Sequence, residues 1–321
     1  MKTPQLDTPN IAFDFRIRPA PFLILAALVA FLFTGCGRSG PTETRRESVY
    51  DRVMRTKKIR AAWLTYPPAA MKDTVTKKLS GTFVEVLEHT AKSCGLDVEW
   101  MDQETPWGNL IEGLNEDRYD IVGSPVWANY ERGKFTTLSR PVYYSGIGIY
   151  VRQNDKRFPD DWTTFGSGTL ATGLINKPEV RISTIDGETG DVIARAQFPA
   201  AQRIALPQNS DIPQLFLEVA NNKADVLFAE PYFAYGYTQN NPGKIRNIAA
   251  RTPVRVLGND FMMKKNESQF KQMIDVAIED LQNSGFVDAI LEKYEKEPGQ
   301  FYRVALPYRS MPSTSKPALR N

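Results

Sequence analysis

Three polar side chains have the chemistry to bind charged groups of a small molecule: Arg132, Thr189 and Glu230. The planar guanidinium of Arg132 offers parallel donors that match a carboxylate, and it stays charged when water is removed. Thr189 follows a strand pattern and opens a helix, where a hydroxyl and free backbone N–H groups bind anions. Glu230 supplies a negative charge that could pair with a cation. Each residue also has a structural alternative. Arg132 could be a solvated surface arginine, Thr189 an ordinary helix cap, and Glu230 an acidic residue that stabilises a helix N-terminus.

The residue inventory disfavours most hydrolytic and metal-dependent chemistry. The chain of 321 residues has one histidine, His89, and two cysteines, which leaves no histidine-rich or thiolate zinc site. It has no Gly-x-Ser-x-Gly elbow, phosphate-binding glycine loop or paired-histidine zinc motif. The 40 basic and 37 acidic residues nearly balance and form no basic block, which argues against a nucleic-acid partner. We expect a binding protein without catalytic residues, metal or cofactor.

Strand and helix patterns alternate from residue 58 onward. Short apolar runs typical of strands occur at 59–64, 96–101, 119–124, 180–185 and 224–229. Helical spacing of apolar residues follows at 83–91, closed by Gly95, then at 110–114 and again after Gly187. Such alternation indicates parallel sheets flanked by helices, with ligands bound at the carboxyl ends of the strands. The restart near residue 180 predicts two similar α/β lobes.

The amino terminus has the pattern of an export signal. Arg16 and Arg18 precede an apolar run at 20–33, which is shorter than the about 20 residues that span a bilayer. The run ends in Phe33-Thr34-Gly35-Cys36, which resembles a bacterial lipobox with phenylalanine in place of the usual leucine. We predict that residues 1–35 are a lipoprotein signal peptide and that Cys36 is acylated at the periplasmic face of a membrane. The alternative is an uncleaved anchor helix.

The segments around the expected lobes are polar. Gly37 stands where an aspartate would indicate inner-membrane retention, so outer-membrane sorting is favoured in a cell with two membranes. Residues 36–55 lack hydrophobic periodicity and are expected to form a tether. Residues 309–321 contain two prolines and are expected to be a disordered tail. With Cys36 acylated, Cys94 is expected to be a buried free thiol.

Taken together, the motifs resemble the family 3 extracytoplasmic solute-binding proteins of ABC importers, which bind polar amino acids. The resemblance covers about residues 56–296. It rests on the order and intervals of Tyr66-Pro67-Pro68, Gly81-Thr82-Phe83, Trp107 to Leu114, Asp120-Ile121-Val122, Glu131-Arg132, Arg140 to Tyr144, Gly187-Glu188-Thr189, Ala224-Asp225 and Phe286 to Tyr294.

This resemblance implies a type II periplasmic-binding-protein fold. Each of its two lobes is a mainly parallel sheet flanked by helices, and the lobes close over a ligand. It implies a discontinuous first lobe at 56–146 plus 256–308 and a second lobe at 147–255. The two hinge crossings are then expected near 144–147 and 250–258.

The resemblance also gives each candidate a role. Arg132 stands 12 positions after Asp120, the family's interval from a strand-end aspartate to the arginine that holds the ligand carboxylate. Thr189 matches a position that binds the second carboxylate oxygen, and Ser124 one that contacts the ligand mainly through its backbone. Glu230 stands where the family usually places an aspartate for the ligand ammonium, and it reaches one methylene further.

Four aromatic residues match pocket positions of the family: Trp63, Tyr66, Trp107 and Trp127. Trp63 stands where binders of basic amino acids carry an acid, so these positions leave no acidic partner for a second positive charge. An aromatic wall would bury an apolar group at about 25 cal/mol per Å². We therefore expect a ligand with an apolar or aromatic side group rather than lysine or arginine. The same wall could hold a cation over its rings, and each aromatic residue could instead belong to a core.

The leading hypothesis is a monomeric, lipid-anchored receptor that captures an amino acid or related small carboxylate and delivers it to the permease subunits of an ABC importer. One alternative is an enzyme on the same scaffold that resembles the cyclohexadienyl dehydratases, with Glu230 as a general acid. Incubation with prephenate or arogenate, followed by a search for an aromatic product, distinguishes the enzyme from the receptor. Another alternative is a ligand-sensing or accessory periplasmic protein, which a neighbouring permease gene would disfavour.

Cys36 provides the first test. Metabolic labelling with a fatty acid should mark the wild-type protein and leave Cys36→Ser unlabelled, because the cysteine sulfur is the expected acyl acceptor. Mass spectrometry of the mature chain should find residues 1–35 removed. Equal labelling of both proteins would contradict the lipoprotein assignment.

Overall fold

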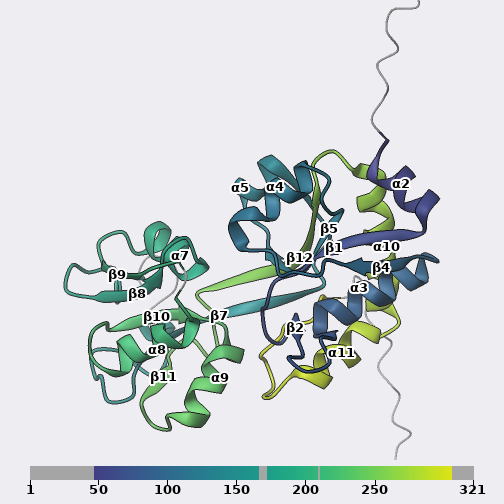
Figure 1. Cartoon of the computed structure of the whole chain (residues 1–321). Coiled ribbons are helices and arrows are strands. Elements are labelled where there is room, and N and C mark those ends of the chain that lie inside the picture. Colours follow the sequence, from purple (N-terminus) through teal and green to yellow (C-terminus); the bar gives the residue numbers. More distant parts are fainter. Residues whose placement is uncertain (1–46, 166–171, 209, 306–321) are drawn as a thin grey trace, which may run out of the picture. The chain divides into compact units, whose positions relative to one another are not determined.

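The computed structural model describes residues 47–165, 172–208 and 210–305 (Figure 1). The predicted signal peptide, Cys36, the first part of the tether and the tail 309–321 lie outside the described residues and stay predictions. Within the described ranges, no helix combines the length and apolar character needed to cross a membrane.

Helices and strands alternate along most of the chain. The helices are α2 (Val49–Thr56), α3 (Thr82–Ser93), η1 (Trp107–Asn109), α4 (Leu110–Asn115), α5 (Tyr130–Phe135), η2 (Trp162–Phe165), α7 (Thr189–Gln197), α8 (Ile212–Ala220), α9 (Pro231–Asn240), α10 (Ser268–Asn283) and α11 (Phe286–Tyr294). The strands are β1 (Lys58–Ala62), β2 (Met71–Lys72), β3 (Leu79–Ser80), β4 (Asp97–Trp100), β5 (Ile121–Trp127), β6 (Thr136–Leu138), β7 (Tyr143–Arg152), β8 (Arg181–Ile185), β9 (Gln202–Leu206), β10 (Val226–Ala229), β11 (Ile245–Asn247) and β12 (Arg255–Lys264).

The main sheet follows the order β4-β1-β5-β12-β7-β10-β8-β9. Its two ends are parallel: β1 pairs in parallel with β4 and β5, and β8 pairs in parallel with β9 and β10. The middle is antiparallel, because β12 and β7 run against each other and against their outer neighbours β5 and β10. Most residues of β5 and β10 are buried, as expected for strands covered on both faces. The α/β class predicted from the sequence is confirmed.

Strands β7 and β12 run side by side and connect the two parallel parts (Figure 1). Residues 143–147 of β7 pair with 255–259 of β12, whereas residues 148–152 of β7 pair with β10 and β11. The crossings expected near 144–147 and 250–258 include these paired segments. The assignment of residues to two lobes stays a prediction.

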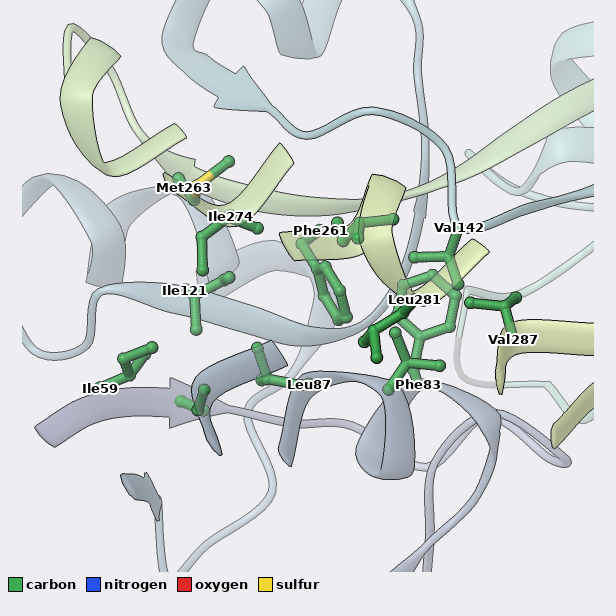
Figure 2. Close-up of a cluster of buried hydrophobic side chains, with 14 of the residues drawn as sticks. Ile59, Phe83, Leu87, Ile121, Val142, Phe261, Met263, Ile274, Leu281 and Val287 are labelled. Atoms are coloured by element: carbon green, nitrogen blue, oxygen red, sulfur yellow. The ribbon is translucent and has the colours of Figure 1, made fainter. Parts of the chain in front are cut away.

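One hydrophobic core surrounds β1, β5 and β12 (Figure 2). The rings of Phe83 on α3 and Phe261 on β12 pack edge to face with centroids 4.8 Å apart. Helices α10 and α11, from the end of the chain, cover the same strands as α3. Other members are Ile59, Leu87, Ile121, Val142, Met263, Ile274, Leu281 and Val287. The carboxyl-terminal helices therefore complete a core that the first strands begin.

The other parallel part has cores of its own. Ile149 and Phe228 belong to one cluster, and Phe198 stacks on Phe228 with ring centroids 5.1 Å apart. Leu227, Phe216 and Tyr150 belong to another cluster. Successive strand residues thus enter different cores, which fixes β8 and β10 between two layers. The residues that follow these strands, Glu188 and Glu230, are held by this packing.

The tether expected at 36–55 is wrong for residues 49–55, which form most of α2. Ser48 caps the helix by accepting a hydrogen bond from the Asp51 N–H at 3.0 Å. Val49 and Val53 lie one turn apart and are buried in the core. Arg52, on the same helix, forms an ion pair with the buried Asp120. The charged residues of this short segment outweighed the helical spacing of Val49, Tyr50, Val53 and Met54, so a polar tether was expected.

Val53→Ala tests whether α2 belongs to the folded unit. Val53 is fully buried, so its truncation should lower the free energy of unfolding by about 1–3 kcal/mol. The matched control is Val276→Ala on α10, whose side chain is 59% exposed and whose change should stay within about 0.5 kcal/mol. Urea denaturation measures both, and equal effects would show that α2 is detached.

Candidate functional site

A buried carboxyl group lies at the end of β10. Glu230 is the residue before α9, and Pro231 occupies the first helical position. The Tyr66 hydroxyl donates a hydrogen bond to Oε2 of Glu230 at 2.6 Å. Burial raises the pKa of Glu230, while hydrogen bonds from Ser145 and Tyr66 act in the opposite direction. Glu230 is therefore held in an environment that favours a proton or a positively charged partner.

Glu230 is part of a hydrogen-bond chain that reaches both central strands. Ser145 on β7 bonds to Glu230 and accepts a hydrogen bond from Nδ2 of Asn259 on β12 at 2.9 Å. Oδ1 of Asn259 accepts from Nε1 of Trp127 at 3.0 Å. Ser145 and Asn259 are buried, and sequence reasoning missed both. Their only signal was a polar residue within a strand pattern: Ser145 in an apolar run, and Asn259 next to Asp260.

Aromatic rings surround Tyr66. Its ring packs edge to face with Trp107 at a centroid distance of 6.2 Å, with Trp127 at 6.1 Å and with Phe233 at 5.3 Å. Three of the four predicted aromatic residues thus come together. Phe233 was missed, although it lies three residues after Glu230 and so on the same face of α9.

Trp63 does not join this cluster. Its side chain is 3% exposed, its indole N–H donates to the Met101 carbonyl at 2.8 Å, and the Lys72 ammonium lies 4.9 Å from its ring centroid. Among the described side chains, Trp63 is absent from those that line the cavity beside Tyr66. Its indole instead secures the segment that follows β1 to the end of β4.

Arg132 lies on α5 beside the aromatic rings. Its Nη1 donates to the carbonyl of Trp127 at 2.8 Å, and its guanidinium carbon lies 5.9 Å from the Trp107 ring centroid. Burial lowers the pKa of Arg132. Within the described part of the chain, no carboxylate forms an ion pair with it, so a desolvated positive charge faces the rings without an acidic partner. Such a group suits an anionic ligand.

Thr189 and Ser124 differ in what they offer. Thr189 is the first residue of α7 and lines the cavity, so the helix N-terminus faces that space. The hydroxyl of Ser124 is already used, because it accepts from the Leu64 N–H at 3.0 Å and donates to the Leu64 carbonyl at 2.9 Å. Ser124 therefore joins β5 to the end of β1, which leaves its backbone as the expected ligand contact.

The cavity itself measures about 10 Å³. This space holds about one water molecule, so side chains must move before an amino acid can enter. In the described ranges, no group of histidine, cysteine, aspartate and glutamate residues is arranged to hold a metal ion. The lining residues are Tyr66, Trp127, Ile147, Glu188, Thr189, Gly190, Ile212, Leu215, Phe228, Ala229, Glu230 and Phe233.

Comparison with known proteins agrees with this architecture. The family model of the bacterial extracellular solute-binding proteins, family 3, matches residues 59–297. The chain belongs to this family. The predicted family is confirmed, and its members are extracellular or periplasmic solute-binding proteins.

Relatives of this solute-binding protein include binding proteins and an enzyme. It is 25% identical over 225 residues to a probable histidine-binding protein of Campylobacter jejuni, covering 68% of this chain and 78% of the relative. It is 24% identical over 251 residues to the cyclohexadienyl dehydratase of Pseudomonas aeruginosa, covering 78% and 87%.

Solved structures confirm the fold. An ancestral amino acid-binding protein, described as a precursor of cyclohexadienyl dehydratase, superimposes with a TM-score of 0.61 at 22% identity, covering 78% of this chain and all of that one. The lysine complex of a putative ABC-transporter binding component from Wolinella succinogenes gives 0.61 at 20% identity, covering 75% and 97%. These likenesses establish the predicted type II periplasmic-binding-protein fold.

Glu188 is the cavity residue that sequence reasoning treated only as part of a motif. It caps α7 by accepting the Gly190 N–H at 2.7 Å. Burial, together with the negative charges of Glu230 and Asp191, raises the pKa of Glu188 to about 7 against the hydrogen bonds from Gly190 and Thr189. The expectation that no acidic partner is present for a second positive charge considered only the aromatic positions, and Glu188 adds a carboxyl group to the lining of the cavity.

The raised pKa of Glu188 makes the stability of the protein depend on pH. The folded state holds this proton more tightly than the unfolded state, so the contribution of Glu188 to stability falls as pH rises from about 4.5 to about 7. Glu188→Gln mimics the protonated form. The free energy of unfolding of Glu188→Gln relative to wild type should rise by about 1–3 kcal/mol between pH 4 and pH 8.

Urea denaturation across this range measures the difference. Asp186→Asn is the control, because it removes an exposed carboxylate from the same loop and leaves the residues that line the cavity unchanged. A Glu188→Gln difference that does not vary with pH would contradict the placement of this carboxyl group in the lining of the cavity.

Proposed function

We propose that this family 3 protein captures an amino acid whose ammonium binds Glu230 and whose carboxylate binds Arg132 and Thr189. The observation that carries the proposal is the buried Glu230 carboxyl, which shares a cavity with the N-terminus of α7 and with aromatic rings. A buried acid of this kind favours a cationic partner, since an unpaired charge in such a place is costly.

Ligand entry must change the Tyr66–Glu230 contact. The Tyr66 hydroxyl occupies the Glu230 oxygen that an ammonium would use, and the cavity has room for about one water. An incoming ammonium replaces a neutral donor by a charged one, which gives a stronger hydrogen bond. Arg132 does not line the small cavity, but it contacts the carbonyl of Trp127, which does. Widening the cavity toward Trp127 would bring the guanidinium to the ligand carboxylate.

The aromatic rings supply the remaining surface. Tyr66, Trp107, Trp127 and Phe233 would pack against the side group of the ligand, which favours a flat or apolar group. The Campylobacter relative is named a probable histidine-binding protein. An amino acid with a flat side group fits both the rings and this relationship.

Delivery to an ABC importer follows from the family. A second relative, from Haemophilus influenzae, is named a probable amino-acid ABC transporter-binding protein and is 34% identical over 116 residues, covering 35% of this chain and 44% of the relative. We propose that the protein acts as a monomer, held by a lipid on Cys36 at the periplasmic face of a membrane, with the outer membrane favoured over the inner. From there it would pass its ligand to permease subunits.

A second candidate function is dehydration of a cyclohexadienyl acid. It is favoured by the Pseudomonas relative and by Glu230, whose raised pKa suits a general acid. Formation of an aromatic product from prephenate or arogenate by the wild type, and its loss in Glu230→Gln, would establish this activity. Binding of amino acids without such turnover favours the receptor.

Arg132→Ala tests the proposed binding site. Removing the guanidinium leaves the ligand carboxylate desolvated and unpaired, so affinity for the best-binding amino acid should fall about 30-fold or more. Arg118→Ala is the control, because Arg118 is half exposed and pairs with Glu112 and Glu116. Calorimetry with a panel of amino acids measures both variants. Unchanged affinity in Arg132→Ala would show that another group holds the carboxylate.

A further inference from the structure

The cavity contains a second acid whose role the proposed amino-acid function does not use. Glu188 and Glu230 both line it, from the loop before α7 and from the end of β10. One acid suffices for the ammonium of an amino acid. The second is next to the carboxylate-binding Thr189 and would repel an anionic or electron-rich ligand group.

The capping role of Glu188 does not by itself explain a glutamate here. Only Oε2 accepts the Gly190 N–H, and Ser, Thr, Asp or Asn would cap the helix as well. Glutamate adds reach, and its side chain belongs to the lining of the cavity. Glu188 interacts electrostatically with Tyr66 and Glu230, and all three residues line the same cavity.

The charged groups around Glu188 do not neutralise it. Asp191, on the next turn, is itself negative and forms ion pairs with Arg195 and Arg203. Glu230 is negative when ionised and is bonded to the neutral Tyr66. Among the described side chains, no lysine or arginine forms an ion pair with Glu188. A positive group of the ligand would supply the missing charge, with the rings around Tyr66 adding cation–π attraction.

We propose that Glu188 is a specificity-determining residue that selects amino acids whose side group carries a positive charge or a strong N–H donor, such as a guanidinium, an imidazolium or an ammonium. The proposal rests on the proposed amino-acid function and departs from the expectation, drawn from the sequence, of an apolar or aromatic side group rather than lysine or arginine. The aromatic rings and Glu188 then bind one flat, cationic group from two sides.

The experiment compares ligands of similar shape that differ in charge. Calorimetry at pH 7.5 on the full mature protein uses arginine against citrulline, lysine against norleucine, and histidine against phenylalanine. Wild type should bind the basic member more tightly in at least one pair, by about 10-fold or more. In Glu188→Gln this preference should fall to about 3-fold or less, while the affinity for the neutral member changes little.

Two further variants distinguish an effect of the Glu188 charge on ligand preference from an effect of the substitution on helix capping. Glu188→Ser keeps a helix-capping oxygen without the reach, so it should lose the preference as Glu188→Gln does. Asp186→Asn removes an exposed charge two residues away and should keep it. Circular dichroism and thermal unfolding confirm that each variant is folded.

The outcomes are distinct. Wild type that binds neutral members as tightly as basic ones, or a preference for basic members that survives in folded Glu188→Gln, would overturn the role of Glu188 and leave the amino-acid function standing. Absence of binding by every compound in wild type would overturn both.

Discussion

The buried carboxyl group of Glu230 is the constraint around which the site is built. A carboxyl removed from water needs hydrogen-bond partners, since its desolvation otherwise costs several kcal/mol. Its partners come from distant parts of the chain: Tyr66 follows β1, and Ser145 belongs to β7. The sheet order, which places β10 next to β7 and β12 next to β5, brings these segments together. The fold therefore supplies hydrogen-bond partners to a buried carboxyl group that an apolar residue at this position would not need.

The same carboxyl is joined to the strands that connect the two parallel parts of the sheet. From Glu230 the hydrogen bonds pass through Ser145 on β7 and Asn259 on β12 to Trp127. Members of a buried network depend on one another, because each loses a partner when its neighbour moves. A ligand that takes over Glu230 therefore acts on a network anchored in both strands. The hinge crossings expected from the sequence fall in or next to these strands.

Three ionisable groups determine the charge in and beside the pocket. Arg132 lies over Trp107 with its pKa lowered by burial, and Glu188 and Glu230 face the cavity with theirs raised. For each of these groups, the charged form is destabilised by desolvation unless a group of opposite charge lies beside it. A zwitterion with an additional positive group would satisfy all three, which links the capture of an amino acid to a choice among its side groups.

The sequence by itself determined the α/β class, the family and most strand positions, because alternating buried strands and capped helices leave a local pattern. It also singled out Arg132, Thr189, Glu230, Tyr66 and two of the rings around Tyr66, through motifs with fixed intervals. Only the tertiary structure decided which side chains share a cavity: Trp63 bonds to Met101 instead, Ser124 bonds to Leu64, and Glu188, Ser145, Asn259 and Phe233 join the site. The physical reason is that a motif gives spacing along the chain, whereas the neighbours of a buried polar group are set by strand register and by packing between segments more than a hundred residues apart, such as Tyr66 and Glu230.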